Sequence, residues 1–416
     1  MRKVNLLTAA VTAALLSTTA SAVDFNGYVR AGVGVSGQGQ NVSFERQNLG
    51  RLGNEDELYG EIGLGQDVWE QDDVKFRVNS MIALVSDQSN DYEGLGGDNP
   101  DEIALRQFNV EATGVLGFAP EATVFVGKRY NQRHDIHITD RYYWNISGAG
   151  AGIENIDMGP GRLSAMWVRS DRSDVEDIGA ASRPNADGDL ALNVNIFDVR
   201  YAGLELWSNS SLELGVDYAM TNESDAYNGK SLKDGVLLTA ELTQSIFNGF
   251  NKTVLQYGTE GYGKAVAYGG DGSWYGAEAE SGASAYRFIN HGVMTFGQFD
   301  ISHQVVWEAS LDDIEANQTD DIETLSVVVR PQYRWNELHT TILELGAFTG
   351  QWADGSDKGG QKYTVAQAIS AGDSFWARPE LRVYASYIKN DEGFVGNAAN
   401  QSDSEVNFGV QVEAWW

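Results

Sequence analysis

The C-terminal residues VNFGVQVEAWW (406–416) alternate between apolar and polar side chains, and this alternation indicates the fold. Successive side chains of an extended strand point to opposite faces. One face is entirely apolar and holds Val406, Phe408, Val410, Val412, Ala414 and Trp416. The other is polar except for its tryptophan and holds Asn407, Gly409, Gln411, Glu413 and Trp415. Such a strand suits either the half-buried sheet of a soluble protein or the lipid-facing wall of a membrane barrel.

The same alternation recurs in VDFNGYVRAGVGV (23–35), ELYGEIGLG (57–65) and SLELGVDYAM (211–220), which we interpret as strands. Long polar stretches such as SDQSNDYEGLGGDNPDE (86–102) alternate with short connections such as FNGF (247–250). Long loops at one end and tight turns at the other are typical of outer-membrane barrels. Strands of about ten residues with these connections predict roughly 16–20 strands. A pair of soluble β-sandwiches is the alternative.

The N-terminus carries the features of an export signal. Arg2 and Lys3 precede an apolar run, which ends at the small residues Ala20-Ser21-Ala22. This pattern predicts that residues 1–22 are a secretory signal peptide and that residues 23–416 form a single barrel domain. The apolar run is shorter than the roughly 20 residues that a transmembrane helix needs. Because no linker divides the chain, two separate soluble domains are disfavoured.

Composition excludes several classes of function. The chain has 42% hydrophobic residues and 11 Trp but a net charge of −30, and its mean hydropathy is −0.32. A barrel gives such an average because inward polar residues and polar loops dilute the apolar outer wall. The negative charge argues against a nucleic-acid partner, which would need an excess of Lys and Arg. The absence of Cys excludes disulfides and thiol chemistry.

The segment GKRYNQRHDIHITDRYYW (127–144) holds His134 and His137 close to Asp135 and Asp140. A metal site is conceivable, but no helix would align these residues and no third soft ligand is near. The stretch AGDSFW (371–376) fits a turn better than a hydrolase nucleophile motif. The glycine-rich stretches AGVGVSG (31–37) and GAGAG (148–152) lack the following Lys of a phosphate loop. We therefore expect no metal, no cofactor and no catalytic residues.

Several aromatic residues occupy the polar face of their predicted strands, where water would otherwise be expected. They are Tyr28, Tyr59 and Trp415, with Trp376 on the same parity as Arg378, Glu380 and Arg382. Arg133, Asp135 and His137 share one parity and would present donors and acceptors to one space. Rings flanked by charged groups suit the apolar faces and hydroxyl edges of sugars. The alternative is that the rings fill space beneath loops that fold inward.

Six segments together resemble one known family. They are VDFNGYVRAGVG (23–34), RLGNEDELYGEIGLGQDVW (51–69), GKRYNQRHDIHITDRYYWNISGAGAGIENIDMG (127–159), LELGVDY (212–218), TAELTQSIFNGFNK (239–252) and GDSFWARPELRVYASY (372–387). With the terminal EAWW, they resemble the maltoporins, the maltodextrin-selective porins of the Gram-negative outer membrane. The resemblance extends from residue 23 to residue 416.

The resemblance implies an 18-stranded, homotrimeric, transmembrane antiparallel β-barrel whose third long loop folds inward as a constriction. It also implies a line of sugar-binding aromatics, the greasy slide, at Tyr28, Tyr59, Tyr92, Phe250, Trp376 and Trp415, with Tyr92 in place of a tryptophan lent by a neighbouring subunit. The constriction tyrosine would be Tyr142. A flanking polar track would comprise Arg30, Arg51, Glu61, Arg106, Arg133, Asp135, His137 and Asp140.

Two residues do not fit this pattern simply. Arg106 shares parity with the apolar Phe108 and Val110, so only the resemblance places it inside. Arg141 would add a cation beside Tyr142.

The expected function is passive diffusion of maltose and maltodextrins across the outer membrane, among outer-membrane lipids and without enzymatic activity. A porin for another glycoside, such as sucrose or a β-glucoside, and a hydrolase or adhesin on a barrel scaffold are the alternatives.

Overall fold

The computed structural model describes residues 23–55, 57–89, 91, 102–171, 192–223, 233–274, 282–312, 321–396 and 401–416. The expected signal peptide, residues 1–22, and Tyr92 lie outside these ranges. Among the described residues, no helix is long and apolar enough to cross a membrane, a finding that concerns helices alone.

Eighteen antiparallel strands of the described residues form one closed barrel. They are β1 (Asp24–Ser36), β3 (Leu58–Gln71), β4 (Val74–Ser86), β5 (Glu102–Thr113), β6 (Thr123–Arg129), β9 (Gly148–Asp157), β10 (Arg162–Asp171), β11 (Leu192–Leu204), β12 (Ser210–Glu223), β13 (Gly235–Ile246), β14 (Gly249–Thr259), β15 (Ser284–Phe296), β16 (Phe299–Asp312), β17 (Glu323–Arg334), β18 (His339–Gln351), β19 (Asp357–Ser370), β20 (Glu380–Asn390) and β21 (Ser404–Trp415). The predicted all-β barrel is confirmed.

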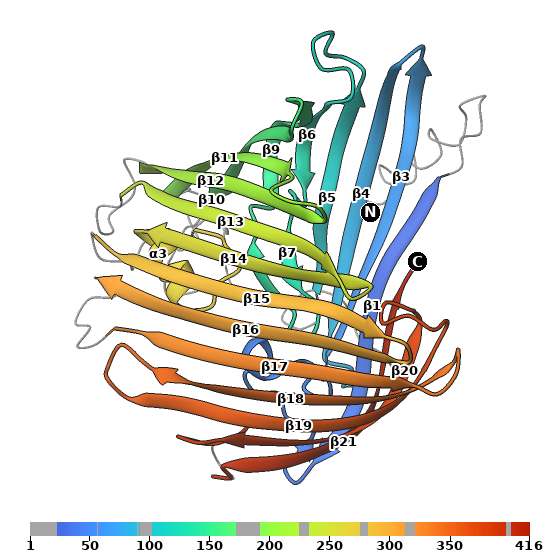
Figure 1. The fold of residues 1–416 in the computed structure, drawn as a ribbon, viewed down its shortest axis with the longest axis vertical. Coiled ribbons are helices and arrows are strands. Elements are labelled where there is room, and N and C mark those ends of the chain that lie inside the picture. The colour runs from blue at the N-terminus through green and yellow to red at the C-terminus, as the bar shows by residue number, and fades with distance from the viewer. Residues whose placement is uncertain are drawn as a thin grey trace, which may run out of the picture.

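Barrel strands that follow one another in the chain lie next to each other, and β1 closes the barrel by pairing with both β3 and β21 (Figure 1). Tight turns join the strands at one end. In the turn between β13 and β14, Phe247 and Asn248 have positive φ angles of 49° and 53°. Two successive positive φ angles are what a two-residue type I′ hairpin turn requires. Closure removes the sheet edges, so each of the eighteen barrel strands is paired on both sides.

The alternation of the C-terminal strand sorts its side chains as its sequence predicts. Asn407 and Glu413 are buried inside the barrel, whereas Phe408 and Val410 are 56% and 47% exposed on the outer wall. A membrane would cover that exposed apolar face. Trp416 also points outward, and its ring centroid lies 5.6 Å from that of Phe25.

Aromatic side chains form a belt on the outside of the barrel at the end with the short turns. Neighbouring rings lie 4.6 to 5.8 Å apart in the pairs Trp69–Phe76, Phe247–Phe296, Phe299–Tyr333, Tyr333–Trp335 and Phe25–Trp416. Aromatic belts of this kind lie at the interface between the hydrocarbon core and water. The belt therefore marks one boundary of the membrane-embedded wall.

Three segments between strands fold into the lumen. The family resemblance implied only one such inward loop. The described residues contain five short elements apart from the barrel strands: β2 (Gly39–Gln40), α2 (Arg46–Leu49), β7 (His134–Ile136), β8 (Arg141–Trp144) and α3 (Gly261–Ala267). Residues 130–147, the constriction loop, carry β7 and β8; α2 and α3 belong to the other two segments. Leu52 beside α2, Trp144 in β8 and Tyr262 in α3 are all fully buried.

Hydrogen bonds hold these segments together and against the wall. The backbone N–H of Arg51 donates to the carbonyl of Ile138 in the constriction loop at 3.0 Å. Lys362 of β19 donates to the carbonyl of Leu52 at 2.8 Å. Trp144 donates its indole N–H to Asp217 of β12 at 2.9 Å. The constriction is therefore anchored to the barrel and can present its side chains in fixed positions.

Candidate functional site

Three aromatic rings lie next to one another on the inner face of β3, β1 and β21. Tyr28 lies directly opposite Trp415 in the pairing of β1 with β21. Tyr59 faces Arg30, two residues further along β1, and the ring centroids of Tyr59 and Tyr28 are 6.2 Å apart. The step from Tyr59 to Tyr28 is therefore diagonal, which rings are large enough to span. The row of aromatics consequently runs obliquely across the strands.

His137 of the constriction loop continues this row. Its ring centroid lies 5.8 Å from that of Trp415 and 5.3 Å from that of Trp376. Trp376 belongs to the turn between β19 and β20 and is 40% exposed. In this turn, the backbone N–H of Trp376 donates to the hydroxyl of Ser374 at 3.2 Å, as expected of AGDSFW as a turn.

Four of the predicted slide residues thus meet in one row, and the place of Phe250 in the slide stays a prediction. Phe250 is the second residue of β14 and packs against a hydrophobic cluster that also contains Phe375. The ring centroid of Phe375 lies 4.8 Å from that of Trp376. The ring centroid of Phe250 is 6.1 Å from that of His291. Tyr92, the remaining predicted slide residue, lies outside the described residues.

Glu413 is the charged centre beside this row, and the sequence analysis did not single it out. One carboxylate oxygen accepts a hydrogen bond from the hydroxyl of Tyr28 at 2.9 Å and lies 3.0 Å from Arg51. The other accepts from Arg378 at 2.7 Å and Arg382 at 2.6 Å. The signal that could have found it is its position two residues before Trp415 on the same polar face. Because three guanidinium groups surround one carboxylate, the arginines are held in fixed positions.

Arg30 and Asp140 form the next pair of the predicted polar track. Arg30 donates to Asp140 at 2.6 Å and to Glu57 at 2.8 Å, while Arg51 donates to Glu55 at 3.0 Å. Burial opposes the charged form of Asp140, but Arg51 and Arg30 outweigh it and hold the pKa of this carboxyl below its usual range. Asp140 therefore stays ionised and can accept hydrogen bonds at neutral pH.

A second polar group surrounds Tyr130, another residue that the sequence analysis missed. Glu61 accepts hydrogen bonds from the hydroxyls of Tyr59 at 2.6 Å and Tyr130 at 2.5 Å. Arg106 donates to the hydroxyl of Tyr130 at 2.6 Å. Tyr130 lies three residues before Arg133 of the predicted polar track, in the quoted segment 127–144. This closeness in sequence is the signal that could have found it.

A β-bulge explains how Arg106 reaches the lumen despite its parity. In the pairing of β4 with β5, Met81 faces Gln107 and the next residue, Ile82, faces Leu105, so Arg106 is the extra residue. A bulge places two residues opposite one and shifts the alternation beyond it. Leu105 and Phe108 consequently both remain on the outer wall, and Arg106 points inward.

The constriction loop itself supplies a stacked arginine. The guanidinium of Arg133 lies 3.4 Å from the ring centroid of Tyr130 and 4.8 Å from that of Tyr142. Burial raises the pKa of Tyr142 to about 12, so its hydroxyl keeps its proton. Asp135 is an exposed carboxylate of the same loop. These groups offer both donors and acceptors at the narrow part of the channel.

Arg141 does not add a cation beside Tyr142, so this expectation was wrong. The alternation of β8 turns Arg141 to the opposite side, where it is 1% exposed. It donates to Glu308 of β16 at 3.1 Å and to Asn48 at 2.7 Å. Arg141 therefore ties the constriction loop to the wall.

The comparisons with known proteins show the family of the chain. The family model described as LamB porin matches residues 23–416. The chain belongs to the LamB porin family. A maltoporin of Photobacterium profundum is 46% identical to this LamB porin over 439 aligned positions, which cover 99% of each chain. A maltoporin of Hahella chejuensis is 44% identical and covers 100% of this chain and 98% of its own.

A solved structure with low sequence identity shares the fold. The crystal structure of a BenF-like porin from Pseudomonas fluorescens Pf-5 has a TM-score of 0.51 at 14% identity, covering 95% of this LamB porin and 99% of that chain. This likeness concerns the fold alone. Family membership confirms the expectation of a porin in place of an enzyme, and the apolar outer wall with its aromatic belt fits the outer membrane.

Proposed function

We propose that this LamB porin is a passive outer-membrane channel for maltose and maltodextrins. The observation that carries the proposal is the oblique row formed by Tyr59, Tyr28, Trp415 and Trp376, which continues across strands and through His137. A glucose ring has an apolar face that stacks on such rings and a rim of hydroxyls. Relatives named maltoporin at 46% and 44% identity support the choice of sugar.

The flanking charges suit the hydroxyl rim. Arg30 lies 5.2 Å from the ring centroid of Tyr59 and pairs with Asp140. Glu61 accepts from the hydroxyls of Tyr59 and Tyr130, and Arg106 donates to that of Tyr130. Each sugar hydroxyl can donate and accept a hydrogen bond. Alternating cations and carboxylates along the wall can therefore bind these hydroxyls at successive positions as the sugar moves. A channel needs binding that is strong enough to admit the solute and weak enough to release it. Serial contacts of modest strength meet this condition without coupling to an energy source.

The test is the conductance of single channels in a planar lipid bilayer. Maltotriose added at increasing concentration should block the ion current reversibly, and maltohexaose should block it at lower concentrations because it contacts more rings. Stronger block by sucrose or an aryl β-glucoside would assign the channel to another glycoside. Open channels that none of these sugars blocks would refute the proposed function.

We further propose that the protein assembles as a homotrimer. Lys128 supports this proposal because it lies on the outer wall of β6, where it is exposed and faces the apolar Phe108 across the ladder. A lysine on a lipid-facing strand costs about 2–4 kcal/mol at the bilayer midplane and less toward the interfaces. A neighbouring subunit at this surface would remove that cost. Light scattering of the detergent-solubilised protein tests the mass, and a monomer under mild conditions would refute the trimer.

The signal peptide is likewise proposed, with cleavage after Ala22. The small residues Ala20-Ser21-Ala22 support it, and the family match begins at residue 23. Mass spectrometry of the protein from outer membranes should find a chain that starts at Val23. A retained N-terminus would refute the cleavage.

A further inference from the structure

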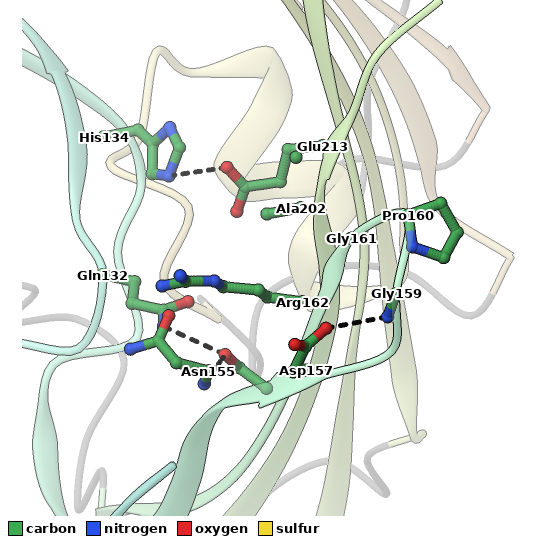
Figure 2. Close-up of a pocket in the computed structure, with 12 residues that line it drawn as sticks. Gln132, His134, Asn155, Asp157, Gly159, Pro160, Gly161, Arg162, Ala202 and Glu213 are labelled. Carbon is green, nitrogen blue, oxygen red and sulfur yellow. Dashed lines mark hydrogen bonds and ion pairs between the residues drawn. The ribbon is translucent and has the colours of Figure 1, made fainter. Parts of the chain in front are cut away.

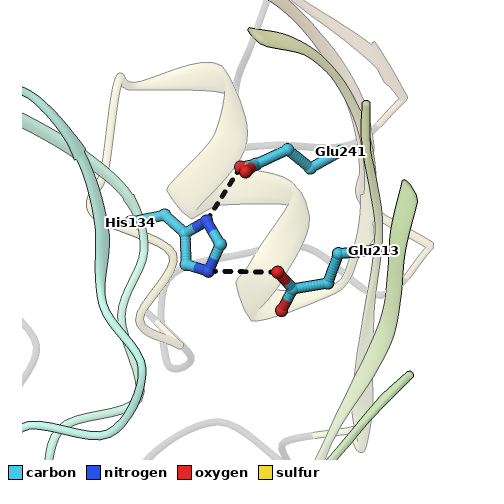
Figure 3. Close-up of side chains that lie close together, drawn as sticks. All are labelled: His134, Glu213 and Glu241. Carbon is cyan, nitrogen blue, oxygen red and sulfur yellow. Dashed lines mark hydrogen bonds and ion pairs between the residues drawn. The ribbon is translucent and has the colours of Figure 1, made fainter. Parts of the chain in front are cut away.

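A second cluster of polar side chains lies on another part of the lumen wall, away from the aromatic row. Its centre is His134 of β7, which lies between Glu241 of β13 and Glu213 of β12 (Figure 3). The Nδ1 atom of His134 is 2.8 Å from Glu241, and its Nε2 atom is 3.6 Å from Glu213. The two ring nitrogens therefore face different carboxylates.

Glu241 is fully engaged and orients the imidazole. Its Oε2 atom accepts hydrogen bonds from the hydroxyl of Tyr143 at 2.7 Å and from His134 at 2.8 Å. Its Oε1 atom lies 2.6 Å from the ammonium of Lys252. Because a carboxylate can only accept, Nδ1 carries the proton in this contact. In metal sites, a carboxylate on the other ring nitrogen commonly fixes a histidine ligand in this way.

The opposite nitrogen and Glu213 leave room for an ion between them. A separation of 3.6 Å between Nε2 and the carboxylate oxygen is too long for a good hydrogen bond. Metal–ligand bonds of about 2.1 Å to each atom would span it at an angle of about 118°, within roughly 10° of the tetrahedral angle. The nearest cation to Glu213 in the described part of the chain is Arg200, at 4.0 Å.

Water could complete the coordination from the adjoining cavity. A cavity of about 500 Å³ opens beside His134 and Glu213 and is lined by polar groups, including Gln132, Asn155 and Asp157 (Figure 2). Arg162 lines the same cavity, and its positive charge should keep a cation from binding tightly. The arrangement thus predicts an open site with few protein ligands and moderate affinity.

We propose that His134 and Glu213 bind a first-row divalent cation, with Glu241 as the positioning residue. Imidazole with carboxylate suits Zn²⁺, Ni²⁺ and Cu²⁺ more than Ca²⁺ or Mg²⁺. The bound ion would link the constriction loop to β12 in addition to the contact with β13. This inference goes beyond sugar transport and does not depend on it. It also revises the expectation that His134 takes part in no metal site.

The test is calorimetric titration of the purified, chelator-treated protein in detergent with ZnCl₂. The wild type should bind one Zn²⁺ per chain. Glu213→Gln keeps the size of the side chain and removes its charge, so it should weaken binding at least tenfold. Glu241→Gln removes the orienting carboxylate and should weaken it 10- to 100-fold. His339→Gln is the matched control, because His339 is an exposed histidine at the start of β18.

Heat-dependent gel mobility shows that each variant is folded before it is titrated. Loss of binding in Glu213→Gln with unchanged binding in His339→Gln supports the site. Equal binding by the wild type and Glu213→Gln, or loss of binding in His339→Gln, would overturn the proposal. A folded wild type that binds no Zn²⁺ would also overturn it.

Discussion

Replacement of Trp415 by Ala tests whether the inward rings bind sugar or merely fill space. The indole lies 4.4 Å from the guanidinium of Arg378 and opposite Tyr28. Arg378 keeps its hydrogen bonds to Glu413 at 2.7 Å and to the carbonyl of Ala377 at 2.9 Å without this ring. The charges that line the lumen should therefore stay in place. The main loss should be one stacking surface for the sugar.

A ring contact of this kind contributes about 0.5–1.5 kcal/mol. Trp415→Ala should therefore weaken binding about two- to twelvefold. The assay is titration of the single-channel current with maltohexaose, which gives the dissociation constant directly. Ion conductance in the absence of sugar should change little. Maltohexaose block as strong as in the wild type would refute the reasoning and would leave the rings as packing beneath the inward loops.

Trp416→Ala is the matched control because the adjacent tryptophan points to the outside. Its backbone N–H donates to the carbonyl of Gly27 at 3.2 Å, which closes the seam between β21 and β1. Gly27 must lack a side chain, since a Cβ there would lie 2.4 Å from the Trp416 ring. Trp416→Ala should lower the yield of assembled protein in refolding assays and leave the sugar affinity of the folded channels unchanged.

Three further predictions concern charge. The net charge of −30 should make the open channel prefer cations, and a reversal potential of the anion-selective sign in a salt gradient would contradict this. Arg141→Ala should lower the free energy of unfolding by about 1.5–3 kcal/mol through the lost charged hydrogen bond to Glu308, measured by denaturant unfolding. Burial lowers the pKa of His137 below its ordinary value of 6.5, so His137 stays neutral there. Block by maltotriose should accordingly be constant from pH 8 to 6.5, and a midpoint within this range would contradict the neutral imidazole.

Period-two alternation was enough to predict the strands and much of the aromatic row. Tyr28, Tyr59 and Trp415 lie inside because neighbouring residues of a strand cannot share a face. Arg106 could not be placed in this way, because the bulge that turns it inward depends on how β4 pairs with β5. Arg141 was misplaced although its parity differs from that of Tyr142, since β8 was not recognised as a strand.

The contacts among the charged residues depended on the tertiary structure. His134 and Glu241 are 107 positions apart in the chain, yet they lie 2.8 Å apart. Their proximity requires the constriction loop to fold across the lumen to a particular pair of strands. The meeting of Glu413 with Arg51 likewise requires β21 to close against β1 while another segment folds inward.

Local sequence determined which residues form strands and which face of each strand is apolar, because these properties follow from the backbone geometry of a few successive residues. Alternation by itself left the choice between a soluble sheet and a membrane barrel open, and the export signal and outward aromatics favoured the barrel. Only the tertiary structure decided which inward side chains meet. Their distances depend on strand register, barrel closure and the path of the inward loops, and each of these is set by contacts between distant parts of the chain.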